Sequence, residues 1–196
     1  MSGYGSTTAL LVVDVQNDFA DPAGSLAVGG AERILPEVNT QVEVAAASGA
    51  PIIFTQDWHP ESTPHFAKEG GIWPVHCVAG TWGAEFHPDL IVKGPIVRKG
   101  SNGEDGYSGF TVRNPITGEE RPTELEDLLR DRGVTRVVLC GLATDYCVKA
   151  TALDARRLGF DTEVLTRAIA AVERQAGDGE RALEEMAAAG VTVSGD

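Results

Sequence analysis

Short runs of apolar residues alternate along this chain with stretches of helical spacing, and this alternation constrains the fold more than any other feature. The runs are rich in Val, Ile and Leu and lack strict apolar–polar alternation, as expected of strands buried on both faces. Strands that alternate with helices predict an α/β domain with a mostly parallel sheet, helices on both faces and right-handed connections. We therefore expect one domain over residues 1–196, with a six-stranded sheet formed by residues 9–15, 51–56, 95–100, 135–142, 160–166 and 191–194.

Four stretches between these runs have the spacing and the end signals of helices. One of them begins with Thr123 and Glu126, which form a capping-box pattern, and ends before Gly133. Glycine also follows the other three, at positions where a left-handed residue commonly ends a helix. The predicted helices are residues 31–48, 123–132, 145–158 and 179–189.

Two connections are much longer than the others. Residues 57–94 and 100–122 exceed the length of a plain connection, so we expect both to be functional loops. In an open parallel sheet, a binding site lies beyond the carboxyl ends of the strands. Polar side chains occur at these ends, namely Asp14 at the end of the first strand, Asp57 and His59 after the second, Lys99 at the end of the third and Cys147 after the fourth.

Cys147 stands in "GLATDYCVKA", which indicates a strand, a tight turn and the start of a helix. The positive end of the helix dipole is expected to lower the pKa of this thiol, and backbone N–H groups of the turn are available to hold an oxyanion. A lone cysteine is more often a small packing residue, which is our interpretation of Cys140. For Cys147 we favour a nucleophile, because other polar residues are expected close to it.

Asp14 and Lys99 each have an ordinary alternative. A carboxylate at the end of a buried strand is unfavourable unless it is paired or functional, although Asp14 could instead cap a turn. Lys99 could be a solvated lysine at the edge of the sheet. At neighbouring strand ends, however, Asp14, Lys99 and Cys147 supply an acid/base, a cation and a nucleophile, so we predict that they are catalytic.

Three of the four histidines of the chain fall between residues 59 and 76. In extended chain, residues two apart point the same way, so Asp57 and His59 can share a ligand site. Together with His65 and His76 they would suit one divalent ion, Zn²⁺, Fe²⁺ or Mn²⁺. The alternative is a polar loop in which His65 caps a turn, and the concentration of histidines argues against it. His87 has no such partner and is interpreted as structural.

Charge and cysteine content argue against several other classes of protein. The net charge of −13 disfavours nucleic acid and anionic membranes as partners, because both would repel the chain. No apolar run approaches the length that spans a bilayer, and the apolar stretch before Asp14 lacks the basic flank of a signal peptide. Three cysteines fit free thiols in a reducing compartment better than a disulfide framework. We therefore expect a cytoplasmic protein, although the charge says nothing positive about its partner.

Several motifs resemble those of nicotinamidases, within the isochorismatase-like cysteine hydrolases. The segments "DVQNDF" and "G-x-A-T-D-x-C" mark the superfamily, whereas "D-x-H-x5-H" followed by "W-P-x-H-C" is narrower and indicates its metal-bearing nicotinamidase branch. The matching segments run in order from about residue 9 to about residue 166 and are "VVDVQNDF", "DWHPESTPHF", "WPVHCVAGTWGAEFHP", "RKG" with "YSGF", and "GLATDYCVKATALDA".

The resemblance implies a role for each matching residue. The three residues predicted to be catalytic match the family's triad, and Asp57 with the three histidines matches its metal ligands. The Leu142–Ala143 bond matches a cis peptide, and the N–H groups of Ala143 and Cys147 match an oxyanion hole. The substrate pocket is matched by Phe19 and Trp73, which would sandwich a pyridine ring, and by Tyr107 and Leu142.

The reaction implied by the resemblance is hydrolysis of nicotinamide to nicotinate and ammonia, with pyrazinamide as a side substrate. Asp14 would take the thiol proton of Cys147, the thiolate would form a thioester, and water would hydrolyse it. The metal would bind the pyridine nitrogen and orient the ring. Such a reaction belongs to NAD salvage and pyridine nucleotide biosynthesis. Relatives are often dimers or larger, so a homo-oligomer is compatible with the resemblance.

One segment departs from the family's pattern, and two alternative functions stay open. After the fifth strand the family often has an acidic residue and a turn of small residues, whereas this chain has Arg167 and Ala168. The first alternative is an amidase for a carbamoyl or ureido substrate, although such relatives generally lack the three-histidine cluster. The second is a non-catalytic binding domain, which would be signalled by loss of the Asp, Lys or Cys.

Overall fold

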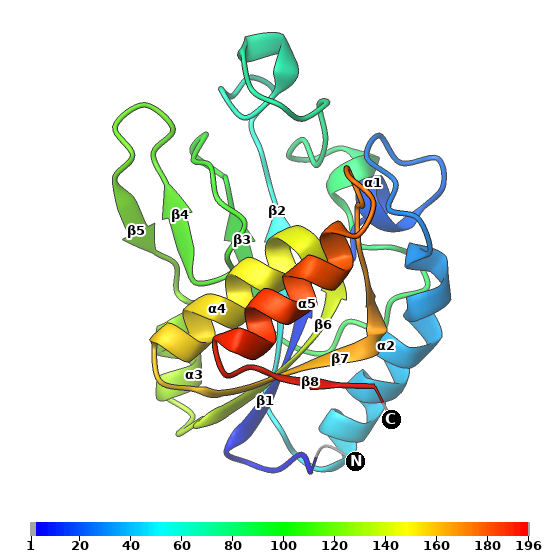
Figure 1. Cartoon of the computed structure of the whole chain (residues 1–196), viewed down its shortest axis with the longest axis vertical. Helices are drawn as coiled ribbons and strands as arrows, with labels where there is room; N and C mark the ends of the chain where they lie inside the picture. Colours follow the sequence, from blue (N-terminus) through cyan, green and yellow to red (C-terminus); the bar gives the residue numbers. More distant parts are fainter. Residues whose placement is uncertain (1–2, 196) are drawn as a thin grey trace.

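The six apolar runs form one parallel sheet in the computed structural model, which describes residues 3–195 (Figure 1). The strand order is β3-β2-β1-β6-β7-β8, and every neighbouring pair is parallel. The predicted fold class and all six predicted strands are therefore confirmed. The strands are β1 (Thr8–Val13), β2 (Ile52–Asp57), β3 (Ile96–Lys99), β6 (Arg136–Leu142), β7 (Asp161–Ala170) and β8 (Thr192–Ser194).

The central strand β1 explains why the apolar runs do not alternate with polar residues. Leu10 pairs with Ile52 of β2 on one side and with Val138 of β6 on the other, so β1 has sheet neighbours along both edges. Leu10 and Val12 pack into a core on one face of the sheet, and the alternating residues Ala9, Leu11 and Val13 pack into a core on the other. A strand covered on both faces gains from apolar side chains at every position.

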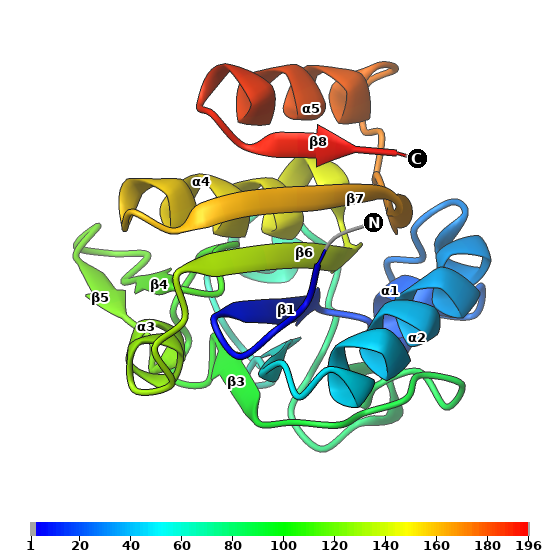
Figure 2. The ribbon, with the colours of Figure 1, turned by 90° about the horizontal axis from the view of Figure 1, so that it is seen from below.

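Helices cover the two faces of the sheet, as Figure 2 shows. On one face, α2 (Ala31–Ala47) buries Ile34, Leu35, Val38 and Val42, which recur at helical spacing. The short helix α1 (Asn17–Ala20) packs on the same side. The other face is covered by α3 (Leu125–Arg130), α4 (Lys149–Arg157) and α5 (Asp178–Ala188). Among the described residues, no helix is long and apolar enough to cross a membrane.

The capping box predicted at Thr123 is only half formed. The hydroxyl of Thr123 accepts a hydrogen bond from the N–H of Leu125 at 3.2 Å, as an N-cap residue does. The N–H of Thr123, however, donates to the carbonyl oxygen of Phe110 at 2.8 Å, so it is not available to Glu126. The tertiary contact with Phe110 replaces the local one.

The two long connections have structure of their own. The loop after β2 contains two short 3-10 helices, η1 (Ala67–Glu69) and η2 (Trp82–Ala84). The connection after β3 contains an antiparallel pair, β4 (Thr111–Arg113) and β5 (Glu120–Pro122), which was not predicted. In Figure 1 both connections project beyond the carboxyl ends of the parallel strands, where a site is expected.

Candidate active site

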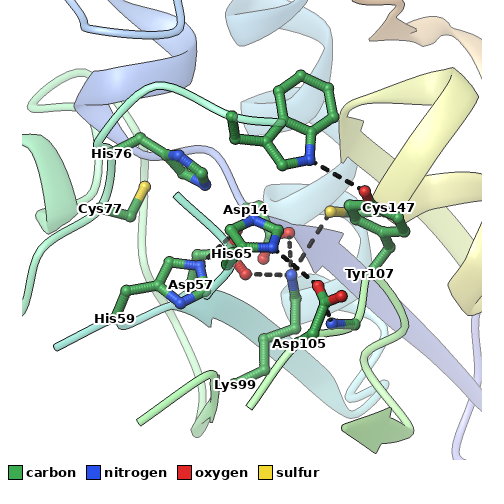
Figure 3. A network of polar contacts seen from close by, with 12 residues as sticks. Asp14, Asp57, His59, His65, His76, Cys77, Lys99, Asp105, Tyr107 and Cys147 are labelled. Atoms are coloured by element: carbon green, nitrogen blue, oxygen red, sulfur yellow. Dashed lines mark hydrogen bonds and ion pairs between the residues drawn. The ribbon is translucent and has the colours of Figure 1, made fainter. Parts of the chain in front are cut away.

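The three residues predicted to be catalytic lie together at the carboxyl ends of their strands (Figure 3). The ammonium nitrogen of Lys99 lies 2.8 Å from Oδ2 of Asp14 and 3.5 Å from the sulfur of Cys147. All three side chains are buried. Lys99 is therefore not the solvated edge lysine of the ordinary alternative.

The carboxylate of Asp14 has one oxygen that is fixed and one that can accept a proton. Oδ1 accepts a hydrogen bond from the hydroxyl of Thr55 at 2.6 Å. Oδ2 forms the ion pair with the ammonium group of Lys99 at 2.8 Å. Burial raises the pKa of Asp14, and the charge of Lys99 only partly offsets this. Asp14 is thus a stronger base than a solvated carboxylate.

The thiol of Cys147 corrects one expectation from the sequence. Cys147 lies in a single turn of π-helix, Thr144–Val148, that leads into α4, so its place at a helix start is as predicted. Its pKa, however, is raised well above the ordinary value by burial, against the lowering effect of Lys99. Asp14 and Asp57 raise it further. Desolvation and two nearby carboxylates outweigh the cation of Lys99, so the resting group is the thiol and needs a base.

Lys99 is held as a cation between two carboxylates. Burial alone would lower its pKa, but the charges of Asp14 and Asp57 raise it well above the usual value. Its ammonium group forms ion pairs with both. The contact with Asp57 was not foreseen, because the sequence placed Asp57 only with the histidines.

The three predicted histidines also come together. One ring nitrogen from each of His59, His65 and His76 lies within 4.8 Å of the others, and all three rings are buried. The long loop folds back to achieve this, since the N–H of His59 donates to the carbonyl of Cys77 at 2.9 Å and the carbonyl of His59 accepts from Ala79 at 2.8 Å. His76 is thereby brought beside His59.

The hydrogen bonds of these rings fit a divalent metal. Nδ1 of His65 lies 2.8 Å from a carboxylate oxygen of Asp105, and Nδ1 of His76 lies 2.7 Å from the carbonyl of Pro74, which leaves the other ring nitrogen of each to bind a metal. Both ring nitrogens of His59 are buried without a hydrogen-bond partner among the described residues, which is unfavourable unless a ligand satisfies one. Burial lowers the pKa of His76 to about 4, so its metal-binding neutral form predominates at pH 7.

Asp57 lies between the three histidines and the three residues predicted to be catalytic. One of its oxygens pairs with Lys99, and the other lies 3.8 Å from Nε2 of His59. Burial would raise the pKa of Asp57, but Lys99 and His59 hold it far below the usual range. A carboxylate oxygen of Asp57 also lies within 4.8 Å of Asp14 and Cys147. Asp57 therefore faces both groups.

A cavity opens beside Cys147 and reaches the histidines. All of the predicted pocket residues line it, and so do Asp57, His65 and His76. The indole N–H of Trp73 donates to the hydroxyl of Tyr107 at 3.0 Å, which fixes the two rings relative to each other. The Leu142–Ala143 peptide bond is cis, as predicted. The lining residues predicted for the pocket and the oxyanion hole are Phe19, Trp73, Tyr107, Leu142, Ala143 and Cys147.

The structure adds supporting residues that sequence reasoning missed. The side chain of Gln16 donates to the carbonyl of Asp57 at 2.7 Å and accepts from its N–H at 2.8 Å, which fixes the end of β2. The carboxylate of Asp145 accepts from the N–H groups of Val172 and Glu173, both at 2.9 Å, and so holds the far wall of the cavity. Arg167, for which no role was predicted, is exposed and lies outside this cavity. The positions of Gln16 and Asp145 inside the quoted motifs were the only signal in the sequence.

Comparison with known proteins identifies a family. The model of the isochorismatase domain matches residues 8–195. A nicotinamidase of Escherichia coli (strain K12) is 37% identical over 203 residues, which cover 94% of this chain and 93% of the relative. The pyrazinamidase of Pyrococcus horikoshii in complex with zinc is 42% identical, with a TM-score of 0.86 over 97% of this chain and 99% of that one. PnC1 from L. infantum in complex with nicotinate is 36% identical, with a TM-score of 0.88 over 98% and 94%.

Proposed function

Since this chain belongs to the isochorismatase domain family, we propose that it is an amidohydrolase that converts nicotinamide and water to nicotinate and ammonia, with pyrazinamide as a second substrate. The observation that carries the proposal is that one cavity is lined both by Cys147 and by His65 and His76 of the histidine cluster. Asp14 and Lys99 lie behind this wall of the cavity, beside Cys147, and His59 lies with the other two histidines. A carboxamide on a nitrogen heterocycle presents a matching pair of groups.

The chemistry begins with a proton transfer from the thiol to Oδ2 of Asp14. Burial raises the pKa of Asp14 and so favours this transfer, and the cation of Lys99 stabilises the thiolate that forms. The thiolate of Cys147 then attacks the carboxamide carbon, and the carbonyl electron pair moves to oxygen. We place that oxyanion at the N–H groups of Ala143 and Cys147, which line the cavity.

Asp14 completes both halves of the reaction. It returns the proton to the amide nitrogen, the carbon–nitrogen bond breaks, and ammonia leaves behind a thioester. Water then gives a proton to Asp14 and its hydroxide adds to the thioester carbon, after which the carbon–sulfur bond breaks. The acid is released as nicotinate, and the thiol of Cys147 is restored.

The histidines and Asp57 would hold the cofactor of this site. One divalent ion bound by Asp57, His59, His65 and His76 would supply a Lewis-acid centre for the ring nitrogen of the substrate. Zn²⁺, Fe²⁺ and Mn²⁺ all suit these ligands, and the similarity to a zinc complex favours Zn²⁺. Phe19 and Trp73 would contact the two faces of the ring, which their place on the cavity wall supports.

The histidine cluster weighs against the first alternative function, and the residues around Cys147 weigh against the second. A carbamoyl or ureido substrate has no ring nitrogen, so an amidase for such substrates would gain nothing from an anchor at the far side of the cavity. A non-catalytic domain would have no use for a buried thiol beside a base and a cation.

The three free, buried cysteines support the cytoplasmic location that belongs to this proposal, with NAD salvage as its context.

Ammonia release tests the proposed function directly. The purified protein is incubated with nicotinamide, ammonia and nicotinate are measured, and the metal content is determined on the same sample. We expect equal amounts of both products and about one bound metal per chain. N-Carbamoylglycine is the comparison substrate. Its hydrolysis in the absence of nicotinamide hydrolysis would move the protein to the other amidase class.

A further inference from the structure

Asp105 contacts the histidine cluster from a loop to which no role has been assigned. It lies between β3 and β4, and its Oδ1 is 2.8 Å from Nδ1 of His65 (Figure 3). Neither the motifs nor the family resemblance pointed to this residue. The side chain of Asp105 is 21% exposed, whereas the side chain of His65 is buried, with only 6% of it exposed.

The carboxylate of Asp105 is itself held from several directions. Oδ1 accepts a hydrogen bond from the N–H of Gly106 at 2.8 Å, and Oδ2 pairs with the guanidinium of Arg113 at 3.0 Å. The backbones of Asp105 and Arg113 also exchange two hydrogen bonds, at 2.7 and 2.6 Å. Because Asp105 is fixed to β4 in this way, it imposes an orientation on His65 rather than following it.

We propose that Asp105 is a positioning residue for the metal centre, which makes this inference dependent on the metal site of the proposed function. A carboxylate that accepts the Nδ1–H of His65 fixes the tautomer that carries its lone pair on Nε2, and it makes that nitrogen a stronger ligand. The Nδ1–H of His76 donates the equivalent hydrogen bond to the backbone carbonyl of Pro74. The carboxylate of Asp105 therefore accepts the Nδ1–H of His65 as the backbone carbonyl of Pro74 accepts that of His76.

This arrangement also gives the β4–β5 pair a function. Arg113 is the last residue of β4, so the β4–β5 pair holds the carboxylate of Asp105 through this ion pair. Asp105 in turn orients the ring of His65. A second contact joins the same two connections, since the hydroxyl of Thr63 donates to the carbonyl of Gly103 at 3.3 Å. The connection after β3 thus stabilises the loop after β2, which carries the three histidines.

Metal affinity tests the role of Asp105 without relying on catalysis. Metal-free wild type, Asp105→Ala and Asp105→Asn are titrated with Zn²⁺ and with Mn²⁺ against a chelating dye. We expect binding to weaken about 10- to 100-fold in Asp105→Ala. The loss in Asp105→Asn should be smaller, because an amide oxygen still accepts the Nδ1–H but lacks the negative charge. In the Co²⁺-loaded protein, the visible absorption bands should shift in the alanine variant.

The chain offers a matched control in another Asp–His pair. Asp89 lies 4.0 Å from Nδ1 of His87, outside the cluster, and its side chain is 81% exposed. Asp89→Ala should bind metal like the wild type. Should Asp105→Ala fail to fold, Arg113→Ala removes only the outer support of the carboxylate, from a side chain that is half exposed, and a weaker loss in the same direction is expected.

Two outcomes contradict different parts of the argument. If wild type and Asp89→Ala bind metal and folded Asp105→Ala matches them within about twofold, Asp105 does not position His65 for the metal. If the wild type binds neither metal, the proposed metal centre fails and this inference fails with it. The two failures are distinguished by the wild-type titration alone.

Discussion

At Cys147, two opposing effects act on one thiol, and burial is the stronger. The cation of Lys99 favours the thiolate, whereas removal from water and the carboxylates of Asp14 and Asp57 favour the thiol. The net direction explains why a base is needed next to the sulfur. It also explains the pKa of Asp14, because the same burial that protects the thiol makes this carboxylate more basic.

Alkylation distinguishes Cys147 from the other two cysteines. Cys147 lines the cavity and is 6% exposed, whereas Cys77 and Cys140 are fully buried. Iodoacetamide should therefore modify Cys147 first, nicotinamide should slow the reaction, and Cys147→Ala should abolish turnover while its circular dichroism is unchanged. Mass spectrometry of peptides gives the order of labelling. Faster modification of Cys77, with activity lost in parallel, contradicts the assignment of the nucleophile.

Replacement of Lys99 by Met should shift the ionisation of the thiol. The cation lowers the pKa of Cys147, so its removal should raise that pKa further and displace the pH profile of alkylation to higher pH. Breaking the buried ion pairs should also destabilise the fold by about 3–5 kcal/mol, so rates are compared at a temperature where the variant is folded. Lys149→Met is the control, because Lys149 pairs with Glu185 at the surface. An unchanged profile in the Lys99 variant means that the cation does not act on the thiol.

At the scale of elements, what could be predicted depended on how local each cause was. Strands such as β1 are specified by apolar runs buried on both faces, and these are visible in the sequence. The fold of the loop after β2 depends on hydrogen bonds between His59 and the distant segment around Cys77, which no local pattern indicates. The β4–β5 pair was missed for a similar reason, since its strands have three residues each and are largely exposed.

At Gly141 the backbone of β6 passes close to the backbone of β1. Gly141 has a φ of +110°, and a Cβ atom there would lie 2.1 Å from the carbonyl oxygen of Val13 on β1. Gly141→Ala should therefore destabilise the protein by about 3 kcal/mol, because two backbones must separate and the left-handed conformation is strained. Gly159→Ala has a similar positive φ of +87° but open space around it, so it should lose only about 1 kcal/mol.

Urea unfolding of both glycine variants measures this difference. The unfolding midpoint should fall much further for Gly141→Ala than for Gly159→Ala, with similar dependence on urea concentration. Equal losses would mean that φ strain alone, and not the contact between β1 and β6, limits substitution at Gly141.

At the scale of the whole molecule, the candidate site combines four strand ends with two long connections. The strand ends could be predicted because parallel strands share one edge of the sheet, and Asp14, Lys99 and Cys147 lie there as expected. The link between these three residues and the histidine cluster could not be predicted. It depends on Asp57, whose two oxygens face Lys99 and His59 at once, and on Asp105, which reaches His65 from another connection.

Removal of the metal should separate substrate positioning from thiol reactivity. If the ion anchors the ring nitrogen, chelation or His59→Ala should suppress nicotinamide hydrolysis, and an error of about 1 Å in placing the carboxamide is enough to lose about 100-fold in rate. Iodoacetamide should still label Cys147, because its base and its cation come from Asp14 and Lys99. Benzamide, which has the carboxamide but no ring nitrogen, should be a poor substrate even for the metal-loaded protein. Equal turnover of benzamide and nicotinamide would contradict the anchor and leave the ion with a structural role, since a metal that contacts only the protein cannot distinguish the two rings.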